Sequence, residues 1–423
     1  MCRSIAEGGR RCPSSSAKPV KAEGVGDIFK GKTSKPSNTA SSTQKPTPYP
    51  EGSPDRTQRK RIKAWKGDIA DLNPKDMLDE IAAGISPSEA ARIQSMSVTD
   101  FGSHMDDLRD RFAVDTTVTG IPDGYRITAD DPAEHVVRHL GHHANTWLAG
   151  QPSMKKAMAD FARTTAEFDN RGRRIDMYSF TEYRRAATRI AAASRGELEP
   201  LLHGTVGTSS VFHVDAVCEM RADGRFYPAS TSTRRGVTKH AKEVSLLLPD
   251  AFKDRGGIDI PLMVVTSNVP RTYYHPAQKW VDHQGCEHTT GVLAYRNSTK
   301  NLAHEFVHYA QARNHYLRAL ESWYLERRAS HTPPVPYYDD EEQFFPGDFP
   351  SIYTGKVYPK GIREVLTTGV EQLYFGYAGA GVGADVNVFK DYTLQTDPAT
   401  GRLRADPDHL NFTLGVLLSA RKV

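Results

Sequence analysis

The amino-acid sequence predicts an α+β protein made of three consecutive parts. These are a disordered basic arm over residues 1–62, a helical domain over residues 63–203, and a C-terminal domain over residues 204–423 with a small mixed sheet. Three observations predict this organisation. The start is rich in Ser, Pro and Lys, apolar residues keep helical spacing up to about residue 200, and short β-rich segments follow.

The arm is predicted from its composition. Residues 13–56 are rich in Ser, Pro, Lys, Thr and Gly and hold too little apolar surface to offset the entropy of ordering. Residues 1–63 hold fourteen Lys or Arg against five Asp or Glu, a net +9, so with +4 overall the remaining 360 residues carry −5. Such an arm can contact nucleic acid weakly. Because it lacks interleaved aromatic residues, we interpret it first as a solvated segment.

The sequence does not favour a membrane protein or a secreted protein held together by disulfides. No apolar run reaches the roughly 18 to 20 residues that span a bilayer, and the start has no apolar core of a secretory signal. Four cysteines, Cys2, Cys12, Cys218 and Cys286, are few for 423 residues and argue against a disulfide-held secreted fold. We expect Cys2 and Cys12 to be reduced thiols; a two-cysteine metal half-site is the alternative.

The helical domain is predicted from apolar residues that recur every three or four positions. An Asp-Pro pair at 131–132 is a helix start, because Pro is tolerated in the first turn. The expected helices are 73–86, 86–96, 98–113, 131–150, 154–168 and 181–194.

The C-terminal domain is predicted from a change of pattern after residue 203. Short segments rich in β-branched and aromatic residues alternate with turn residues, which is typical of strands. The expected strands lie within 209–220, 224–231, 259–267 and 291–297. Long helices are expected at 299–329, 361–376 and 407–423.

The stretch "NLAHEFVHYAQ", residues 301–311, predicts a zinc site. Residues four apart share one face of a helix, so His304 and His308 can present two imidazole nitrogens to one ion. Glu305 follows His304 and can hold a water as general base, while zinc lowers the pKa of that water. Ser298 or Thr299 can cap the helix start. The alternative is a core helix with two satisfied histidines.

A third protein ligand is required, and the sequence leaves several candidates. Gln311 stands where a metzincin has a glycine, and His315 lies about 10 Å further along the same expected helix, so it cannot reach the ion. A carboxylate from a later helix is the remaining choice. Glu364 and Glu371 lie seven apart and share a face, and Glu341 and Glu342 form a third option in an acidic loop.

The pattern "HEFVH" with the later "GIREVLTTGVEQLYFG" resembles zincin metallopeptidases of the gluzincin kind, and more closely the anthrax lethal factor type of catalytic domain. The resemblance implies a zincin-like C-terminal domain, a Zn²⁺ cofactor and a protein or peptide substrate. It assigns His304, His308 and Glu364 to the metal and Glu305 to the water.

Two further roles come with this resemblance. Tyr358 is the counterpart of a tyrosine that stabilises the oxyanion. Glu371 would orient His304 or His308 through a ring N–H, or would itself replace Glu364 as the ligand. The strand at 291–297 would be the sheet edge that pairs with an extended substrate.

A second resemblance concerns origin. The opening "MCRSIAEGGRRCP" is similar to N-termini of proteins from actinobacteria and their phages. "DPDHLNFTLGVLL", together with "REVLTTGVEQL", resembles metallopeptidase domains of phage and prophage head-gene regions. This implies phage head or portal proteins as partners, and a location in the bacterial cytoplasm or the virion. The competing function is a virion structural or minor-head protein whose zincin fold has no catalytic role.

The segment "HVVRHLGHH" supplies His135, His139, His142 and His143. His135 and His139 have the helical spacing of metal ligands, but no glutamate or cysteine partner lies nearby in the sequence. We therefore interpret the segment as a partly exposed, histidine-rich helix face.

The segments "LLHGT" and "FYPASTSTRRG" resemble ADP-ribosyltransferases, in which a His strand and a Ser-Thr-Ser strand hold a nicotinamide dinucleotide. His203 and Ser230 would be the counterparts. The downstream glutamate that this reaction needs is absent at a suitable spacing, so we interpret the region as a β-rich connector.

Overall fold

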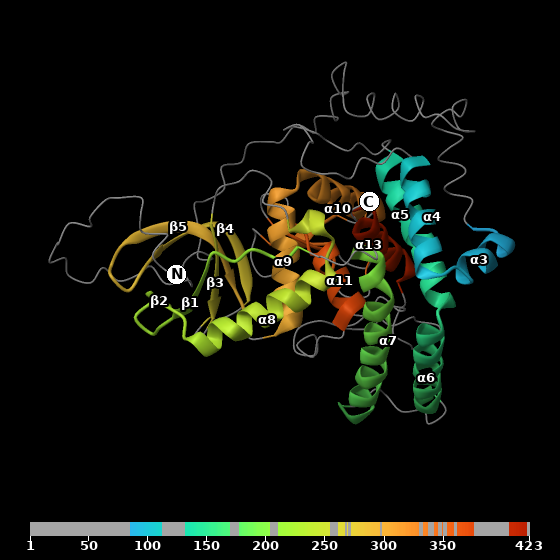
Figure 1. The fold of residues 1–423 in the computed structure, drawn as a ribbon, viewed down its shortest axis with the longest axis horizontal. Coiled ribbons are helices and arrows are strands. Elements are labelled where there is room, and N and C mark those ends of the chain that lie inside the picture. Colours follow the sequence, from blue (N-terminus) through green and yellow to red (C-terminus); the bar gives the residue numbers. More distant parts are fainter. Residues whose placement is uncertain are drawn as a thin grey trace, which may run out of the picture.

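The computed structural model has a mixed α+β fold, in which one group of helices packs beside a small mixed sheet (Figure 1). The predicted arm over residues 1–62 and the helix predicted from residue 73 lie outside the described residues. These are 85–111, 132–169, 177–203, 210–253, 261–266, 269, 272–296, 298–329, 333–336, 342–345, 349, 353–358, 362–375 and 406–420.

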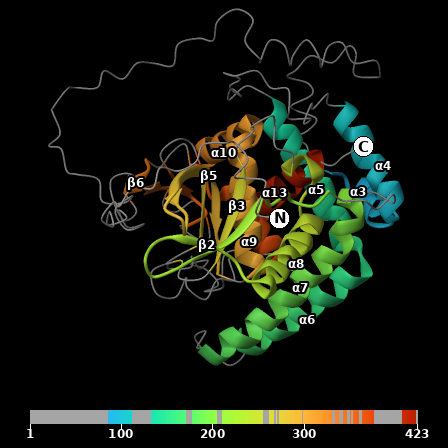
Figure 2. The same cartoon turned by 60° about the vertical axis from the view of Figure 1, so that its left-hand side comes forward.

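The helices predicted before residue 203 are confirmed within this part of the chain. The first begins after Ser86, whose side chain accepts a hydrogen bond from the backbone N–H of Glu89, and Pro87 occupies its first turn. Helices α6 and α7 run side by side, as Figure 2 shows. Their bounds are α3 Pro87–Gln94, α4 Val98–Arg111, α5 Pro132–Gly150, α6 Pro152–Asp169 and α7 Met177–His203.

The main sheet has five strands in the order β2-β1-β3-β5-β4, with β1, β3 and β5 parallel and an antiparallel strand at each edge. The expectation that the strand at 291–297 is an edge is wrong, because β5 is hydrogen-bonded on both sides. The edge is β4, which the sequence did not predict and which holds a Pro and an irregular register, as edge strands tolerate. The strands are β1 Ala216–Met220, β2 Phe226–Pro228, β3 Leu262–Thr266, β4 Tyr273–Val281 and β5 Glu287–Ala294.

A helix that the sequence did not predict, α8 (Thr231–Leu247), covers one face of the sheet together with α9 (Figure 1). Ser230 caps it by accepting a hydrogen bond from the N–H of Thr233. Its buried residues include Val237, Ala241 and Val244, a helical spacing that the surrounding Ser, Thr, Lys and Arg residues obscure. A one-turn 3₁₀ helix, η3, follows at Asp250–Phe252.

The single long helix predicted at 299–329 is two helices, α9 (Thr299–Arg313) and α10 (His315–Arg328). Asn314 separates them with an extended backbone, φ −115° and ψ 98°. Its N–H bonds the carbonyl of Ala310 at the end of α9, and its side chain accepts from the N–H of Leu317 to cap α10. A single asparagine thus ends one helix and starts the next.

The remaining elements complete a core that the helices and the sheet share. Helix α13 packs along α5 so closely that a Cβ on Gly141 would lie 1.6 Å from the carbonyl oxygen of Asn411. Core residues before and after residue 203 belong to the same cluster, and the domain boundary at 203–204 stays a prediction. These elements are β6 Val335–Pro336, β7 Gln343–Phe344, β8 Lys356–Val357, α11 Val365–Phe375 and α13 Pro407–Ser419.

Two further sequence expectations concern membrane-spanning helices and the cysteines. Within the described residues, no helix has both the length and the apolar character needed to cross a bilayer. Cys218 is buried in β1 and is not part of a disulfide, whereas Cys2 and Cys12 lie outside the residues that the structure describes.

Candidate metal centre

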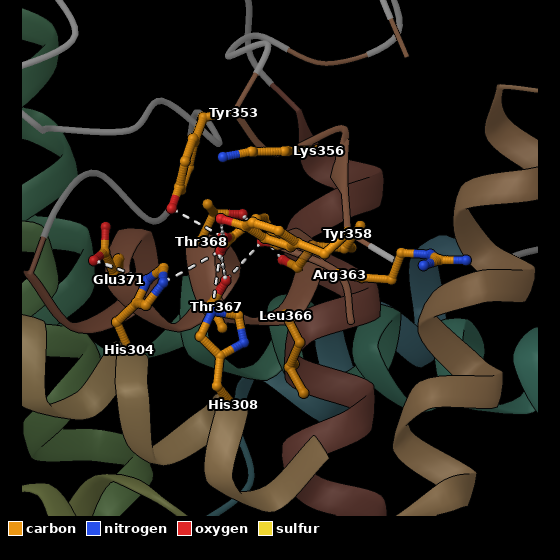
Figure 3. A network of polar contacts seen from close by, with 12 residues as sticks. His304, His308, Tyr353, Lys356, Tyr358, Arg363, Leu366, Thr367, Thr368 and Glu371 are labelled. Atoms are coloured by element: carbon orange, nitrogen blue, oxygen red, sulfur yellow. Dashed lines mark hydrogen bonds and ion pairs between the residues drawn. The ribbon is translucent and has the colours of Figure 1, made fainter. Parts of the chain in front are cut away.

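Helix α9 carries the two histidines of the HExxH pattern on one buried face. Ser298 caps the helix by accepting from the N–H of Asn301 at 3.5 Å, one of the two caps expected. His304 and His308 are each 7% exposed, and their ring centroids lie 4.8 Å apart. Both rings point toward the start of α11 (Figure 3). The i, i+4 spacing therefore gives a pair of converging imidazoles.

Glu364 completes a group of three candidate metal ligands at this point. Its Oε2 lies 3.2 Å from Nε2 of His304 and 3.4 Å from Nε2 of His308, and its side chain is fully buried. We call His304, His308 and Glu364 the α9–α11 site; these three groups could hold a metal ion. The two distances agree with the edge of about 3.3–3.4 Å of a tetrahedron whose metal–ligand bonds are about 2.0–2.1 Å long.

The backbone around Glu364 differs slightly from the sequence expectation. The helix predicted at 361–376 begins at Val365, so Glu364 precedes it and its carbonyl accepts the first helical bond from Thr368. A carboxylate at the amino end of a helix is stabilised by the helix dipole. This position places the side chain over α9.

Charge inside the α9–α11 site is balanced between its members. Burial favours the neutral carboxyl, but His308 and His304 outweigh it and hold the pKa of Glu364 well below its usual range. Burial likewise disfavours the imidazolium, yet Glu364 holds the pKa of His304 well above its ordinary value and also raises the pKa of His308. A metal ion bound here would displace these protons.

Two tyrosines fix the second oxygen of the Glu364 carboxylate. Its Oε1 accepts hydrogen bonds from the hydroxyls of Tyr353 at 2.9 Å and Tyr358 at 2.7 Å, while Oε2 accepts from Thr367 at 2.7 Å. Burial raises the pKa of both tyrosines well above 10, so both hydroxyls remain donors. The sequence indicated Tyr358 only. Tyr353 stands eleven residues before Glu364 in no recognisable motif, and only the fold brings it here.

A chain of polar contacts orients His308 from behind. Nδ1 of His308 lies 2.7 Å from Oε1 of Gln311, whose Nε2 donates to both oxygens of Glu321 at 2.8 and 2.7 Å. Glu321 also accepts a hydrogen bond from the N–H of Leu366. Because the Glu321 oxygens act as acceptors, the side-chain nitrogen of Gln311 faces Glu321 and the side-chain oxygen of Gln311 faces the ring of His308. Nδ1 therefore carries the proton and Nε2 faces the site. No sequence pattern indicates these roles for Gln311 and Glu321.

Glu371 lies on the outer side of His304. Its Oε1 is 3.1 Å from Nδ1 of His304, and its Oε2 is 3.5 Å from the ammonium of Lys300. Glu364 and Glu371 thus contact different nitrogens of the same ring. Figure 3 shows Glu371 beside His304. This geometry favours Glu364 over Glu371 as a metal ligand and gives Glu371 the orienting position.

The other sequence candidates lie apart from this group. Glu342 forms an ion pair of 2.6 Å with Lys356, and Glu341 lies outside the described residues. His315 begins α10 beyond the break at Asn314, so the expectation that it continues the helix of His308 is wrong, and its side chain lies outside what the structure describes. Glu342 does not belong to the metal-type groups of the described chain.

Glu305 is buried beside the two histidines. Its side chain is 3% exposed, and its Oε2 has no hydrogen-bond partner within the described part of the chain. Burial raises the pKa of Glu305 to about 7, although His304 and His308 act in the opposite direction. A buried carboxylate oxygen without a partner is costly unless a water or an ion meets it. Glu305 therefore fits the predicted role of holding a water.

The histidine-rich segment of α5 is more buried than expected. His143 is only 5% exposed, its Nδ1 lies 3.0 Å from Nε2 of His104 on α4, and its ring packs edge-on against His139. His139 and His142 are half-buried, and His135 lies in the same helix. The prediction of an exposed face is wrong for His143, because contact with α4 covers it.

The structure separates the two residues suggested by the ADP-ribosyltransferase resemblance. Ser230 caps the start of α8, whereas Nε2 of His203 lies 2.9 Å from the carbonyl oxygen of Leu246 near the end of the same helix. With about 1.5 Å per residue, roughly 24 Å separates these two ends. His203 ends α7 rather than lying in a strand, so the two side chains do not line one cleft.

Comparisons with protein-family models, curated proteins and solved structures gave no significant match to this chain. The functional argument therefore depends on the geometry of the α9–α11 site.

Proposed function

We propose that the chain is a zinc-dependent metallopeptidase that hydrolyses peptide bonds in a protein or peptide substrate. The observation that carries the proposal is the convergence of Nε2 of His304, Nε2 of His308 and Oε2 of Glu364 at 3.2 and 3.4 Å. Glu305, whose Oε2 has no hydrogen-bond partner among the described residues, lies next to His304 in the sequence and is buried as well. A buried core helix with two satisfied histidines has no need of this fourth group.

The donor set suits zinc. Two imidazole nitrogens and one carboxylate oxygen are typical of catalytic zinc sites, which keep the fourth position of a tetrahedron open. When bound there, zinc would polarise the substrate carbonyl and lower the pKa of a water towards ~7. Gln311 and Glu371 each contact an outer nitrogen of one ligand ring, and partners of this kind fix ring orientation in zinc sites.

Glu305 would act as the general base. It would take a proton from the attacking water and later give that proton to the nitrogen of the leaving amine, so that the proton count balances. With a pKa raised to about 7 by burial, the carboxyl can accept and release a proton near neutral pH. A neighbouring cation lowers that pKa and favours the carboxylate, which is the form a base requires.

Tyr358 would turn its single hydroxyl proton from Glu364 to the substrate oxygen that becomes negative during attack, while Tyr353 keeps its hydrogen bond to Oε1 of Glu364. The hydroxyl of Tyr358 lies 2.7 Å from Oε1 of Glu364, the ligand candidate, so it is already held at the edge of the site. Tyr353 holds an equivalent position at 2.9 Å and is a second donor candidate. Both remain protonated because burial raises their pKa values.

The substrate would bind in an extended form along β4. This strand is one of the two edges of the main sheet, it runs antiparallel to β5, and it packs against α9. The guanidinium of Arg313 on α9 donates to the hydroxyl of Tyr274 on β4 at 2.8 Å, which fixes the strand beside the helix. An extended peptide can add to such an edge through backbone hydrogen bonds.

We also propose a zincin-like fold of the anthrax lethal factor type for residues 204–423, in a phage or prophage head-region protein. A mixed sheet beside the HExxH helix and a carboxylate carried at the start of a later helix support the fold. The phage assignment rests on the terminal sequence resemblances. Head or portal proteins, and nucleic acid at the basic arm, are the proposed partners.

Glu305→Gln tests the proposed reaction. The substitution keeps the shape of the side chain but removes the base, so zinc content should be unchanged while cleavage of an unstructured protein or a peptide library falls by about 10²–10⁴-fold. Glu326→Gln, at an exposed position of α10, is the matched control and should retain activity. Undiminished cleavage by Glu305→Gln would disprove the mechanism.

The same assay separates the competing functions. Zinc-loaded wild type that cleaves nothing would favour a virion structural protein whose metal site is not used for turnover. Turnover of a nicotinamide dinucleotide that persists with a chelator would favour ADP-ribosyl transfer instead.

A further inference from the structure

A second group of metal-ligand type lies among the amino-terminal helices. It consists of Glu89 on α3, His104 on α4 and His143 on α5, and one nitrogen or oxygen of each lies within 4.8 Å of the others. We propose that this group, named the α3–α5 site, binds a divalent transition-metal ion of the zinc or cobalt type. The proposal is independent of the peptidase function, because it uses none of the residues of the α9–α11 site.

The two imidazoles are already close to the spacing that an ion needs. Nε2 of His104 and Nδ1 of His143 lie 3.0 Å apart, slightly less than the edge of about 3.3 Å of a tetrahedral zinc site. Without an ion, one of these nitrogens must donate a proton to the other. Each ring has a second nitrogen that can carry its proton, so both facing nitrogens can become metal ligands together.

Glu89 is held toward this pair by Arg92. The guanidinium donates from Nε to Oε2 of Glu89 at 2.8 Å and from its terminal nitrogen to Oε1 at 2.5 Å. Each carboxylate oxygen has two lone pairs, so this fork leaves one on each oxygen for an ion. The negative charges of Glu89 and Asp107 favour a cation beside His104, and the positive charge of Arg92 opposes them. The guanidinium thus orients the carboxylate but adds a repulsion that the three ligands must outweigh.

The surroundings hold the ligands in place before any ion binds. Phe101 stacks on Trp147 with ring centroids 4.7 Å apart and also contacts His104. The indole N–H of Trp147 donates to the carbonyl of Met96 at 3.1 Å, which fixes the connection between α3 and α4. His143 is buried, whereas Glu89 and His104 are half-buried, so an ion can enter from solvent without unfolding.

The position of the ion indicates its effect. Helix α3 has eight residues, too few for an isolated helix to be stable. An ion shared by Glu89, His104 and His143 would tie α3 to α4 and α5 through bonds much stronger than the side-chain packing alone. No glutamate follows His104 or His143 in the way that Glu305 follows His304, and we therefore infer that the ion stabilises the amino-terminal helices rather than catalysing a reaction.

The test uses the full chain with the α9–α11 site removed. After dialysis against buffered free Zn²⁺, or Co²⁺ for its absorption spectrum, the metal per chain is measured. Wild type should bind two ions and His304→Ala/His308→Ala one. Adding His104→Gln to that double variant should bring the content to none, with loss of the Co²⁺ spectrum. His142→Gln is the matched control on α5, and it should leave one ion bound.

A second readout follows the proposed effect. In the His304→Ala/His308→Ala background, Zn²⁺ should slow amide hydrogen exchange over residues 87–94, and Glu89→Gln should abolish the slowing. Glu89 is half-buried, so this variant is expected to fold even if His104→Gln does not. The proposal is overturned if His304→Ala/His308→Ala binds no ion. It is also overturned if the ion of this double variant remains after His104→Gln and after Glu89→Gln, because that ion would be an adventitious ion only. Failure of the peptidase assay would leave this result unaffected.

Discussion

The α9–α11 site and the α3–α5 site contain the same side-chain types, two imidazoles and one carboxylate, in different settings. At the first site all three are buried and the carboxylate is fully so. At the second only His143 is buried, and its carboxylate partner is shared with a guanidinium. The first site is buried and has Glu305 beside its ligands, with one carboxylate oxygen that lacks a partner among the described residues, which suits a catalytic site. The second site is partly exposed and lies between three helices, which suits an ion that holds those helices together.

The second difference is the layer of residues behind the ligands. At the α9–α11 site, Gln311 and Glu371 contact the outer nitrogens of both histidines, and Glu321 secures Gln311. At the α3–α5 site the corresponding support is Arg92, which is 52% exposed on its side chain. Residues that hold a ligand side chain from a buried position restrict it to one geometry. We therefore expect the α9–α11 site to bind its ion more tightly than the α3–α5 site and to tolerate fewer substitutions.

Glu364→Ala should have the largest effect on this comparison. It removes the carboxylate that faces both imidazoles, so affinity of the α9–α11 site for Zn²⁺ should fall by more than about 100-fold and cleavage should be lost. The ion of the α3–α5 site should remain. Competition with a chromophoric chelator measures both, and Glu326→Ala is the control. Unchanged high-affinity binding would show that Glu364 is not a ligand.

Tyr358→Phe should have the next largest effect, and only on turnover. Loss of one oxyanion donor costs about 10²–10³-fold in kcat, with zinc content unchanged. The hydroxyl of Tyr353 contacts the same oxygen of Glu364, so Tyr353→Phe is the matched comparison. Steady-state cleavage by both variants decides the assignment, since a larger loss for Tyr353→Phe would transfer the role to Tyr353.

Gln311→Met compares the supporting layers directly. It removes the acceptor for Nδ1 of His308 at similar volume, so zinc affinity at the α9–α11 site should weaken by about 10–100-fold. Arg92→Met at the α3–α5 site should weaken its ion by less than about tenfold, because exposed ion pairs contribute little. Equal effects measured by chelator competition would contradict the difference in support.

A pH effect should mark the buried layer of the α9–α11 site. Burial raises the pKa of Glu321 from 4.5 to about 8, so between these values the folded chain holds a proton that the unfolded chain has released. The unfolding free energy of metal-free protein should therefore fall as pH rises through this window, by up to about 1.4 kcal/mol per pH unit. Urea titrations should show a flatter pH dependence for Glu321→Gln than for Glu326→Gln. Identical slopes would show that Glu321 is ionised in the folded state.

The expectations that the structure confirms depend on residues within a single helix or strand. Helix α5 was predicted from its Asp-Pro start and apolar spacing. The pairing of His304 with His308 follows from the 3.6 residues per turn of an α-helix, which place residues four apart on one face. The break at Asn314 and helix α8 were missed, because a helix-ending asparagine and a polar helix face look ordinary in sequence. Edge strand β4 was missed because its pattern is irregular and its neighbours decide its place.

The sequence by itself determined the fold class, the course of most helices, and the two imidazoles and carboxylate of "HEFVH", because residues on one helix keep fixed geometry. Only the tertiary structure decided which distant groups meet them. Glu364 rather than Glu371 faces both Nε2 atoms, Tyr353 joins Tyr358, and α3, α4 and α5 bring three unrelated residues together. Such contacts depend on how elements pack against each other, and no local spacing records the packing.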